Sequence, residues 1–325
     1  MNPNPETAKW VLWGYKSIYH THNHIHEAFY RALRHMGKEV LWLEVTDDIS
    51  SYDFTGSIFI TEHQKLDSLP MRRDCLYLVH NLCGNERPQF HDGGYPVIGW
   101  GCYVHANLPG YGPDDMPKLG PESIKLADGA YFTPQGRDSG FQIMWATNLL
   151  PHEIEANKPD RILGRESRVI NWVGTCNLSH NGSTIAPFVK ECEKNGISFR
   201  PSGAYTNGHV VTDADAQNLI RESYFAPAIG NELQRRVDYV PCRLFKNVSY
   251  GMPGITNIAY GLNLFDGTIC YERDSARLFY EAQRYMERVS VKALHAQMDV
   301  VAQSHTYINR IQEMITACKL YWESL

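Results

Sequence analysis

The sequence predicts an α/β protein with two Rossmann-like domains facing a cleft. Its short strands are almost continuously apolar, which is typical of a parallel sheet covered on both faces. The first such strand is followed by an amphipathic helix and a second strand. After a linker, a strand–loop–helix–strand pattern begins again near residue 168. The length of 325 residues also favours about two domains.

Composition narrows the class of protein. A hydrophobic content of 43% and a charged content of 21% are those of a globular protein. The net charge of −5 argues against a general nucleic-acid or anionic-membrane surface. No apolar run reaches the ~18–20 residues of a membrane span, and the first residues lack a signal-peptide pattern. The eight cysteines form no CxxC pair, so we expect reduced thiols and a cytoplasmic protein.

The N-terminal half opens with a buried strand at residues 10–15. A polar His-rich loop follows, and then a helix at 26–37, which Gly37 ends. Further strands are expected at 39–45, 57–61, 75–80 and 96–100. Residues 110–140 show little periodicity, and 145–160 are expected to be a linker that acts as a hinge.

The second half repeats this pattern. Strands are expected at 168–174, 197–200, 224–229 and 268–271. Helices are expected at 184–195 and 216–222, followed by a run over 275–302 and a terminal helix at 307–324. At the start of the second helix, Asp213 and Asp215 spell DxD, a metal–diphosphate motif of some sugar transferases. The preceding Thr212 makes helix capping the favoured interpretation.

The stretch 241–257 has the strongest chemical signal. Arg243 and Lys246 share one helix face, and the turn from Gly251 to Gly254 follows them. Fixed positive charge beside exposed backbone N–H groups suits a phosphate or diphosphate. A solvated charged face followed by an ordinary loop is the alternative.

Six motifs in the C-terminal half occur in an order typical of a known family. They are Arg243-Leu244-Phe245-Lys246, Ser249-Tyr250-Gly251, Gly254-Ile255-Thr256, Leu264-Phe265-Asp266-Gly267, Ile269-Cys270-Tyr271 and the run from His305 to Arg310. Over residues 168–315 the chain resembles the donor-binding domain of GT-B glycosyltransferases, closest to the CgeB-like and exostosin-like groups. The N-terminal half fits only the general GT-B pattern.

This resemblance implies three parts: an acceptor-side domain at 1–155, a nucleotide-sugar-binding domain at 156–304, and a helix at 305–325 that returns to the first domain. It implies a glycosyltransferase that needs no metal or other cofactor. The donor would be a nucleotide-diphosphate sugar, with UDP or GDP favoured, and the acceptor a hydroxyl of a glycan or another molecule.

The donor site implied by the resemblance and by the residue chemistry comprises Gly174, Thr175, Asn177, Asn231, Arg243, Lys246, Ser249, Tyr250, Gly251, Thr256, Asn257 and Glu272. Arg243 would hold the diphosphate. Where the family has a Glu for the ribose hydroxyls, this chain has Lys246, which cannot accept those hydrogen bonds. Either Lys246 also binds phosphate, or another acceptor such as Glu272 reaches the ribose.

The histidine run from His20 to His26 marks the N-terminal half. His22, His24 or His26 could act as general base on the acceptor hydroxyl. Alternating histidines on an extended chain also suit a metal, as in metal-dependent hydrolases, with His80, His105 and Asp128 as further ligands. A metal-dependent hydrolase and a non-catalytic nucleotide-sugar-binding protein are therefore the alternative functions.

Overall fold

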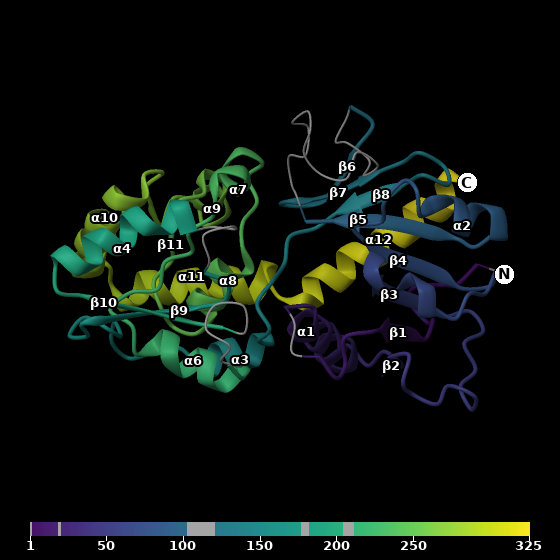
Figure 1. The fold of residues 1–325 in the computed structure, drawn as a ribbon, viewed down its shortest axis with the longest axis horizontal. Coiled ribbons are helices and arrows are strands. Elements are labelled where there is room, and N and C mark those ends of the chain that lie inside the picture. Colours follow the sequence, from purple (N-terminus) through teal and green to yellow (C-terminus); the bar gives the residue numbers. More distant parts are fainter. Residues whose placement is uncertain (1, 19–20, 103–120, 177–181, 204–210) are drawn as a thin grey trace. The chain divides into compact units, whose positions relative to one another are not determined.

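The structure is a computed structural model that describes residues 2–18, 21–102, 121–176, 182–203 and 211–325 (Figure 1). The chain divides into two compact units. Unit 1 comprises Met1–Met144 and Tyr307–Leu325, and unit 2 comprises Trp145–Thr306. Both ends of the chain therefore belong to unit 1. The boundaries predicted from the sequence lie after residues 155 and 304.

Unit 1 contains an eight-stranded sheet in the order β2-β1-β3-β4-β5-β8-β7-β6. The first six strands in this order are parallel, and β7 and β6 extend the sheet as antiparallel strands. The strands are β1 (Trp10–Trp13), β2 (Val40–Leu43), β3 (Ile58–Glu62), β4 (Leu76–His80), β5 (Val97–Gly101), β6 (Ile124–Ala127), β7 (Ala130–Thr133) and β8 (Gly140–Gln142). The sheet order reverses at β1, because β2 lies on one side of it and β3 on the other.

Helices cover both faces of this sheet. They are α1 (Thr21–His35), the 3-10 helix η1 (His63–Ser68), α2 (Arg87–Gly93) and α12 (Tyr307–Ser324). On one face, Phe29 of α1 contacts Trp100 of β5 and Tyr307 of α12, with ring centroids 6.3 and 4.6 Å apart. On the other face, Phe90 of α2 and Leu66 of η1 join a core cluster with alternate residues of the strands. Burial on both faces explains why these strands are apolar throughout.

Two local predictions for unit 1 are wrong. The histidine run is not an extended loop, because α1 already begins at Thr21. In a helix, residues four apart share a face, so His22 and His26 lie on one side and His24 on another. The segment 110–140, expected to be irregular, contains β6, β7 and β8 in its described part. The Gly and Pro residues of this segment led to the prediction of irregular structure. Its short strands are stabilised by pairing within the sheet and not by local propensity.

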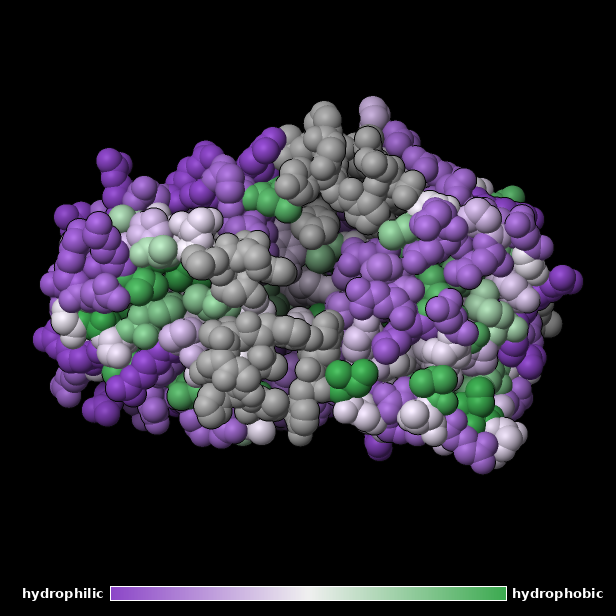
Figure 2. All heavy atoms as spheres, in the orientation of Figure 1, coloured by the Kyte–Doolittle hydropathy of each residue, from purple (hydrophilic) through white to green (hydrophobic). Residues whose placement is uncertain are grey.

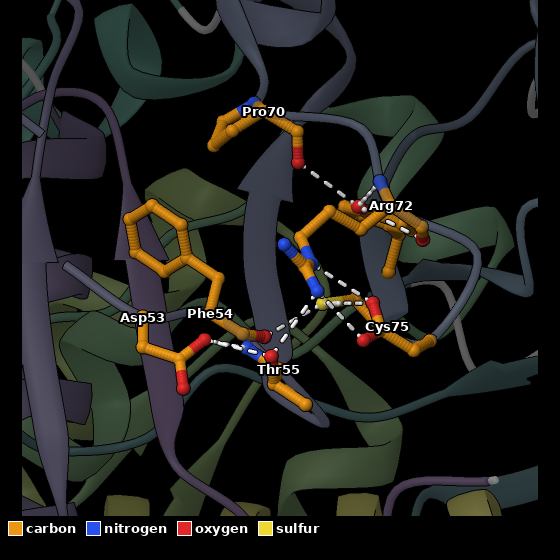
Figure 3. Close-up of polar contacts among 8 residues, drawn as sticks. Asp53, Phe54, Thr55, Pro70, Arg72 and Cys75 are labelled. Atoms are coloured by element: carbon orange, nitrogen blue, oxygen red, sulfur yellow. Dashed lines mark hydrogen bonds and ion pairs between the residues drawn. The ribbon is translucent and has the colours of Figure 1, made fainter. Parts of the chain in front are cut away.

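The amino ends of β3 and β4 are tied together by polar contacts (Figure 3). The guanidinium of Arg72 donates to both carboxylate oxygens of Asp74 at 2.8 Å and to Thr55 Oγ1 at 3.1 Å. The thiol of Cys75 donates to the carbonyl of Phe54 at 2.9 Å. These contacts fix the loops that precede β3 and β4, at the amino edge of the sheet.

Unit 2 is built on a second parallel arrangement, β9 (Val169–Val173), β10 (Ser198–Ser202), β11 (Ile255–Thr256) and β12 (Cys270–Tyr271). The strand predicted at 224–229 is not regular. Its backbone nevertheless connects β9 to β11, since Tyr224 N donates to Val169 O and Ala228 N donates to Ile255 O. Pro227 lacks an N–H between these two bonds, which explains the interruption.

Helices pack on both sides of this arrangement. They are α3 (Pro151–Ala156), α4 (Ser183–Lys194), α6 (Asp213–Arg221), α7 (Glu232–Arg236), α8 (Cys242–Ser249), α9 (Ala259–Leu264), α10 (Ser275–Arg288) and α11 (Val291–Ser304). Phe188 of α4 meets Phe279 of α10 with ring centroids 5.8 Å apart. The run predicted over 275–302 is two helices, because the side chain of Ser290 caps a new one. The first part of the linker predicted at 145–160, Trp145 to Leu149, is buried in unit 2, and α3 follows it.

The surface combines hydrophobic and hydrophilic residues. Figure 2 shows hydrophobic residues in separate patches among hydrophilic ones on the face drawn. No helix of the described part combines the length and apolar character that a membrane crossing requires. All eight cysteines are free thiols.

Candidate functional site

Two glycines mark the carboxyl ends of β9 and β10 in unit 2. Gly174 has φ +118° and donates its N–H to Ser202 O at 2.8 Å. A Cβ on Gly203 would lie 3.0 Å from the carbonyl oxygen of Gly174. Only glycine allows two backbone segments to meet this closely. Gly174 and Gly203 thus carry no side chains at this edge, which is the position where α/β proteins bind ligands.

Arg243 of α8 reaches this edge. Its guanidinium carbon lies 3.8 Å from the centre of the Trp172 ring, and its Nε donates to Val173 O at 3.1 Å. A Cβ on Gly174 would be 2.6 Å from Nη2 of Arg243. The guanidinium is therefore stacked on Trp172, oriented by the carbonyl of Val173, and in close approach to the backbone of Gly174 at the end of β9. Burial lowers the pKa of Arg243, but a guanidinium stays protonated in proteins.

The two terminal nitrogens of Arg243 are available for a ligand. Within the described residues, the hydrogen bond that the guanidinium makes uses Nε alone. A planar fork of this kind suits the oxygens of a phosphate, which accept two parallel hydrogen bonds. A cation held by stacking on a Trp ring also loses little conformational freedom when it binds.

Lys246 lies one helical turn beyond Arg243. Burial by itself lowers its pKa, but the nearby groups of Tyr250 and Asp213 outweigh that effect and raise the pKa to about 12. Its ammonium makes no hydrogen bond or ion pair with any residue in the described part of the chain. Lys246 is thus a half-buried permanent cation on the same helix face as Arg243.

A polar network surrounds Lys246. Asn148 Nδ2 donates to Asp213 Oδ2 at 2.7 Å, and the hydroxyl of Tyr250 donates to Asn148 Oδ1 at 2.8 Å. Asp213 therefore supplies negative charge near Lys246. The capping interpretation of the DxD motif is confirmed for Asp215, whose N–H donates to Thr212 Oγ1 at 3.1 Å.

Three further residues of the predicted donor site make buried contacts at the carboxyl end of α8. Ser249 is fully buried, and its hydroxyl bonds Lys246 O at 2.8 Å and Thr147 Oγ1 at 2.7 Å. Tyr250 is buried against Asn148. Gly251 has φ +89°, and a Cβ there would lie 3.2 Å from Asn157 O. These residues hold the helix end, whereas Arg243 and Lys246 carry its charge.

Thr256, Asn257 and Asn231 use their side chains on nearby backbone. Thr256 Oγ1 donates to Ala228 O at 2.9 Å, and the amide of Asn257 bonds both N and O of Gly230 at 2.7 and 3.0 Å. Asn231 caps α7 by accepting from the N–H of Gln234. The sequence predicted these residues as ligand contacts, whereas in the structure their side chains bond the backbone of residues 228–234 and fix that segment.

Glu272, Thr175 and Asn177 complete the predicted donor set. Glu272 follows β12, and one of its carboxylate oxygens accepts from Asp274 N at 2.9 Å. Its other oxygen has no partner in the described residues. Thr175 follows Gly174, and its carbonyl accepts from Trp172 Nε1 at 3.2 Å. Asn177 lies outside the described residues, as do His20 and His105 from the N-terminal predictions.

In unit 1, the three predicted catalytic histidines have different surroundings. His26 is 1% exposed, and its Nδ1 lies 3.0 Å from Gly14 O, so Nδ1 carries the proton and donates. Burial lowers the pKa of His26 to about 4. His24 is half-buried on another side of α1. His22 is paired with a carboxylate, since its Nε2 lies 3.3 Å from Glu62 Oε1.

His80 completes a cluster with His22 and Glu62. His80 Nδ1 lies 2.8 Å from Glu62 Oε2, and the ligating atoms of all three residues lie within 4.8 Å of one another. The three come from the start of α1 and from the ends of β3 and β4, at the edge where the strand order reverses. Sequence reasoning named His22 and His80 but missed Glu62. Its position directly after the predicted strand 57–61 was the available signal. Asp128, the other described ligand predicted, instead pairs with Lys125 at 2.6 Å.

Comparisons with known proteins show the fold alone. The chain matches no family model and no curated protein sequence. Among solved structures, it is similar to one described as trehalose-6-phosphate from E. coli bound with UDP-2-fluoro glucose. The identity is 9%, the TM-score is 0.51, and the match covers 96% of this chain and 99% of the other. The chain therefore has the α/β fold of GT-B proteins.

Proposed function

We propose that this protein is a glycosyltransferase that moves a sugar from a nucleotide-diphosphate sugar to a hydroxyl group of a glycan or another acceptor. The fold it shares with a structure bound to UDP-2-fluoro glucose supports a nucleotide sugar as donor. The proposed relation to the CgeB-like and exostosin-like groups rests on the motifs of the C-terminal half.

The observation that carries the proposal is the pair Arg243 and Lys246. Arg243 is fixed by Trp172 at a bare backbone edge, and Lys246 holds a positive charge without an ion-pair partner in the described residues. Two cations one turn apart match the two phosphates of a diphosphate.

Their chemistry also fits the reaction. When the glycosidic bond breaks, the nucleoside diphosphate that leaves gains negative charge. Cations already fixed at its phosphates stabilise this state more than the ground state, and that difference accelerates transfer. Because Lys246 has a pKa of about 12, it remains charged throughout the neutral range.

We assign the ribose to Glu272. It follows β12 at the same sheet edge at which Gly174 follows β9, separated by the segment 224–228 and β11. Three strand spacings amount to about 14 Å, a distance that an extended nucleotide sugar can bridge. One of the carboxylate oxygens of Glu272, without a partner among the described residues, can accept a hydrogen bond from a hydroxyl. Glu272 would thus supply the ribose acceptor that the family has at the position of Lys246.

On the acceptor side, we assign activation of the hydroxyl to the cluster around His22. Glu62 lies against its imidazole and would stabilise the protonated form as a proton is accepted. His26 is a poor alternative because its pKa of about 4 makes it a weak base and because it is buried.

The first test is ligand-dependent thermal stabilisation with UDP, GDP, ADP, CMP and their sugars, with and without EDTA. A ligand at 100 times its Kd adds roughly 2.7 kcal/mol to the free energy of unfolding. One diphosphate should stabilise the protein regardless of EDTA.

Two variants test the site itself. Arg243→Ala removes about 1.5–3 kcal/mol of charge-assisted hydrogen bonding, so binding of that diphosphate should weaken roughly 10- to 100-fold. Gly174→Ala should also weaken binding, because its Cβ would displace the guanidinium of Arg243. Arg284→Ala is the matched control, since the Arg284 side chain is 67% exposed on α10.

Unchanged diphosphate binding and transfer in Arg243→Ala would refute the proposed site. A protein that binds one nucleotide sugar through Arg243, yet neither transfers nor slowly hydrolyses it, would instead be a non-catalytic binding protein.

A further inference from the structure

We infer that His22, Glu62 and His80 form a binding site for one divalent transition-metal ion of the zinc class in unit 1. Two imidazoles and one carboxylate are a donor set that such ions prefer. The three side chains come from three separate elements, α1, β3 and β4, which places them together only in the folded protein.

The spacing of the donor atoms fits a shared ion. Atoms bound about 2.0–2.1 Å from zinc in a tetrahedron lie about 3.3–3.4 Å apart. His22 Nε2 and Glu62 Oε1 are 3.3 Å apart. His80 Nδ1 and Glu62 Oε2 are 2.8 Å apart, so a bound ion would replace the hydrogen bond between them. Three protein ligands leave a fourth position for water or a substrate oxygen.

Charge also favours a cation at this place. The Glu62 side chain is 2% exposed, and its ion-pair partners within the described residues are the two imidazoles. A buried carboxylate is costly unless a positive charge balances it. A divalent ion supplies that charge while both histidines remain neutral, which is the form that binds metals.

The surroundings are those of a functional site. Trp100 packs on His80 with ring centroids 4.5 Å apart, and Tyr15 packs on His22 at 5.0 Å. Tyr15 has φ +58° and Asn81, directly after His80, has φ +54°. Left-handed backbone is unusual for a Tyr, and such strain is concentrated at binding and catalytic sites.

The site is independent of the donor site proposed in unit 2. A metal bound here would lower the pKa of an oxygen bound at its fourth position, whether that oxygen belongs to water or to an acceptor hydroxyl. It would then take over the activation assigned above to the imidazole of His22.

The test uses the full-length protein after chelator dialysis. Co²⁺ is titrated while its visible absorption is recorded, bound Co²⁺ is displaced with Zn²⁺, and metal content is measured after removal of free ions. We expect one equivalent per chain and a Co²⁺ spectrum typical of nitrogen and oxygen ligands. Glu62→Gln and His22→Gln should each weaken Co²⁺ binding more than about 100-fold.

Matched controls separate this site from its neighbours. His24→Gln changes a histidine on the same helix and should leave Co²⁺ affinity within about twofold. Cys83→Ser tests the adjacent group of His63, Cys83 and Glu86 and should also leave the stoichiometry at one. Far-ultraviolet circular dichroism confirms folding, and His22→Gln is the decisive variant, because His22 is partly exposed and its loss should not unfold the chain.

Absence of Co²⁺ binding in the folded wild type would overturn the inference. Binding that persists in both Glu62→Gln and His22→Gln, or that is lost in Cys83→Ser alone, would overturn it as well. Diphosphate binding in unit 2 is measured on the same samples, so failure of one proposal does not obscure the other.

Discussion

His26 shows how a polar residue can serve the core rather than the chemistry. It lies on the buried face of α1, and its imidazole donates to the carbonyl of Gly14, which follows β1. Burial disfavours the charged form and lowers the pKa to about 4, and His80 adds to this effect. The neutral ring ties α1 to the first strand.

This burial predicts a specific dependence of stability on pH. The unfolded chain binds a proton at His26 below pH 6.5, whereas the folded chain does so only below about pH 4. Stability from this residue is therefore fully present above pH 6.5 and is lost as the pH falls toward 4. The loss should be about 2 kcal/mol by pH 5.

Urea unfolding at pH 7 and pH 5 measures this effect in the wild type and in His26→Asn. The Asn amide can still donate to Gly14 O but does not titrate, so the pH dependence should shrink by about 2 kcal/mol. An equal pH dependence in both proteins would show that His26 is not the titrating group.

Residue chemistry alone pointed to some residues of the two proposed sites and not to others. Arg243 and Lys246 could be predicted because their spacing on a helix is local information. The role of Trp172 under Arg243 and the meeting of Glu62 with two histidines could not, because these contacts join elements far apart in sequence. Thr256 and Asn257 appeared polar and available, but the fold directs their side chains to backbone groups.

At the scale of elements, Gln297 connects α11 to the turn that precedes β11. It is completely buried, its Oε1 accepts from Gly254 N at 3.0 Å, and its Nε2 donates to Thr268 O at 2.7 Å. One amide thus satisfies the buried N–H of Gly254 and shares the carbonyl of Thr268 with the hydroxyl of Tyr285. This connection fixes the turn from Gly251 to Gly254, which follows α8, and thereby the position of α8 with Arg243.

Gln297→Leu should lower the free energy of unfolding by about 1–3 kcal/mol, because the buried N–H of Gly254 loses its acceptor, whereas the carbonyl of Thr268 keeps the hydroxyl of Tyr285 as a donor. Chemical denaturation of the variant measures the change. Lys292→Leu, at an exposed position of the same helix, should alter stability by no more than about 0.5 kcal/mol. Equal effects of the two substitutions would contradict the assigned role.

At the scale of the whole molecule, the chain leaves unit 1 after Met144 and returns to it at Tyr307. The returning helix α12 packs on α1, where Tyr307 meets Phe29. It also buries an ion pair, Arg310 to Glu313 at 2.8 Å, and burial raises the pKa of Glu313. The last 19 residues are thus part of the core of the first unit.

Removal of residues 307–325 should destabilise unit 1 selectively, because it uncovers the apolar face of α1. Hydrogen exchange should become faster in β1, β3 and β4 while β9 and its neighbours keep their protection. Removal of Leu325 alone is the control, since this residue is 61% exposed. Unchanged protection in β1, β3 and β4 after the longer deletion would refute the role assigned to α12.

The sequence by itself determined the α/β class, most strands and helices, and the helix that presents Arg243 and Lys246. These features depend on local periodicity, on capping residues and on residue spacing within one element. Only the tertiary structure decided that α1 begins at Thr21 and includes His22, His24 and His26, that β6 to β8 extend the sheet, and that His22, Glu62 and His80 meet. Short strands and side-chain clusters are stabilised by partners distant in the chain. The local sequence around such a strand or cluster therefore does not predict it.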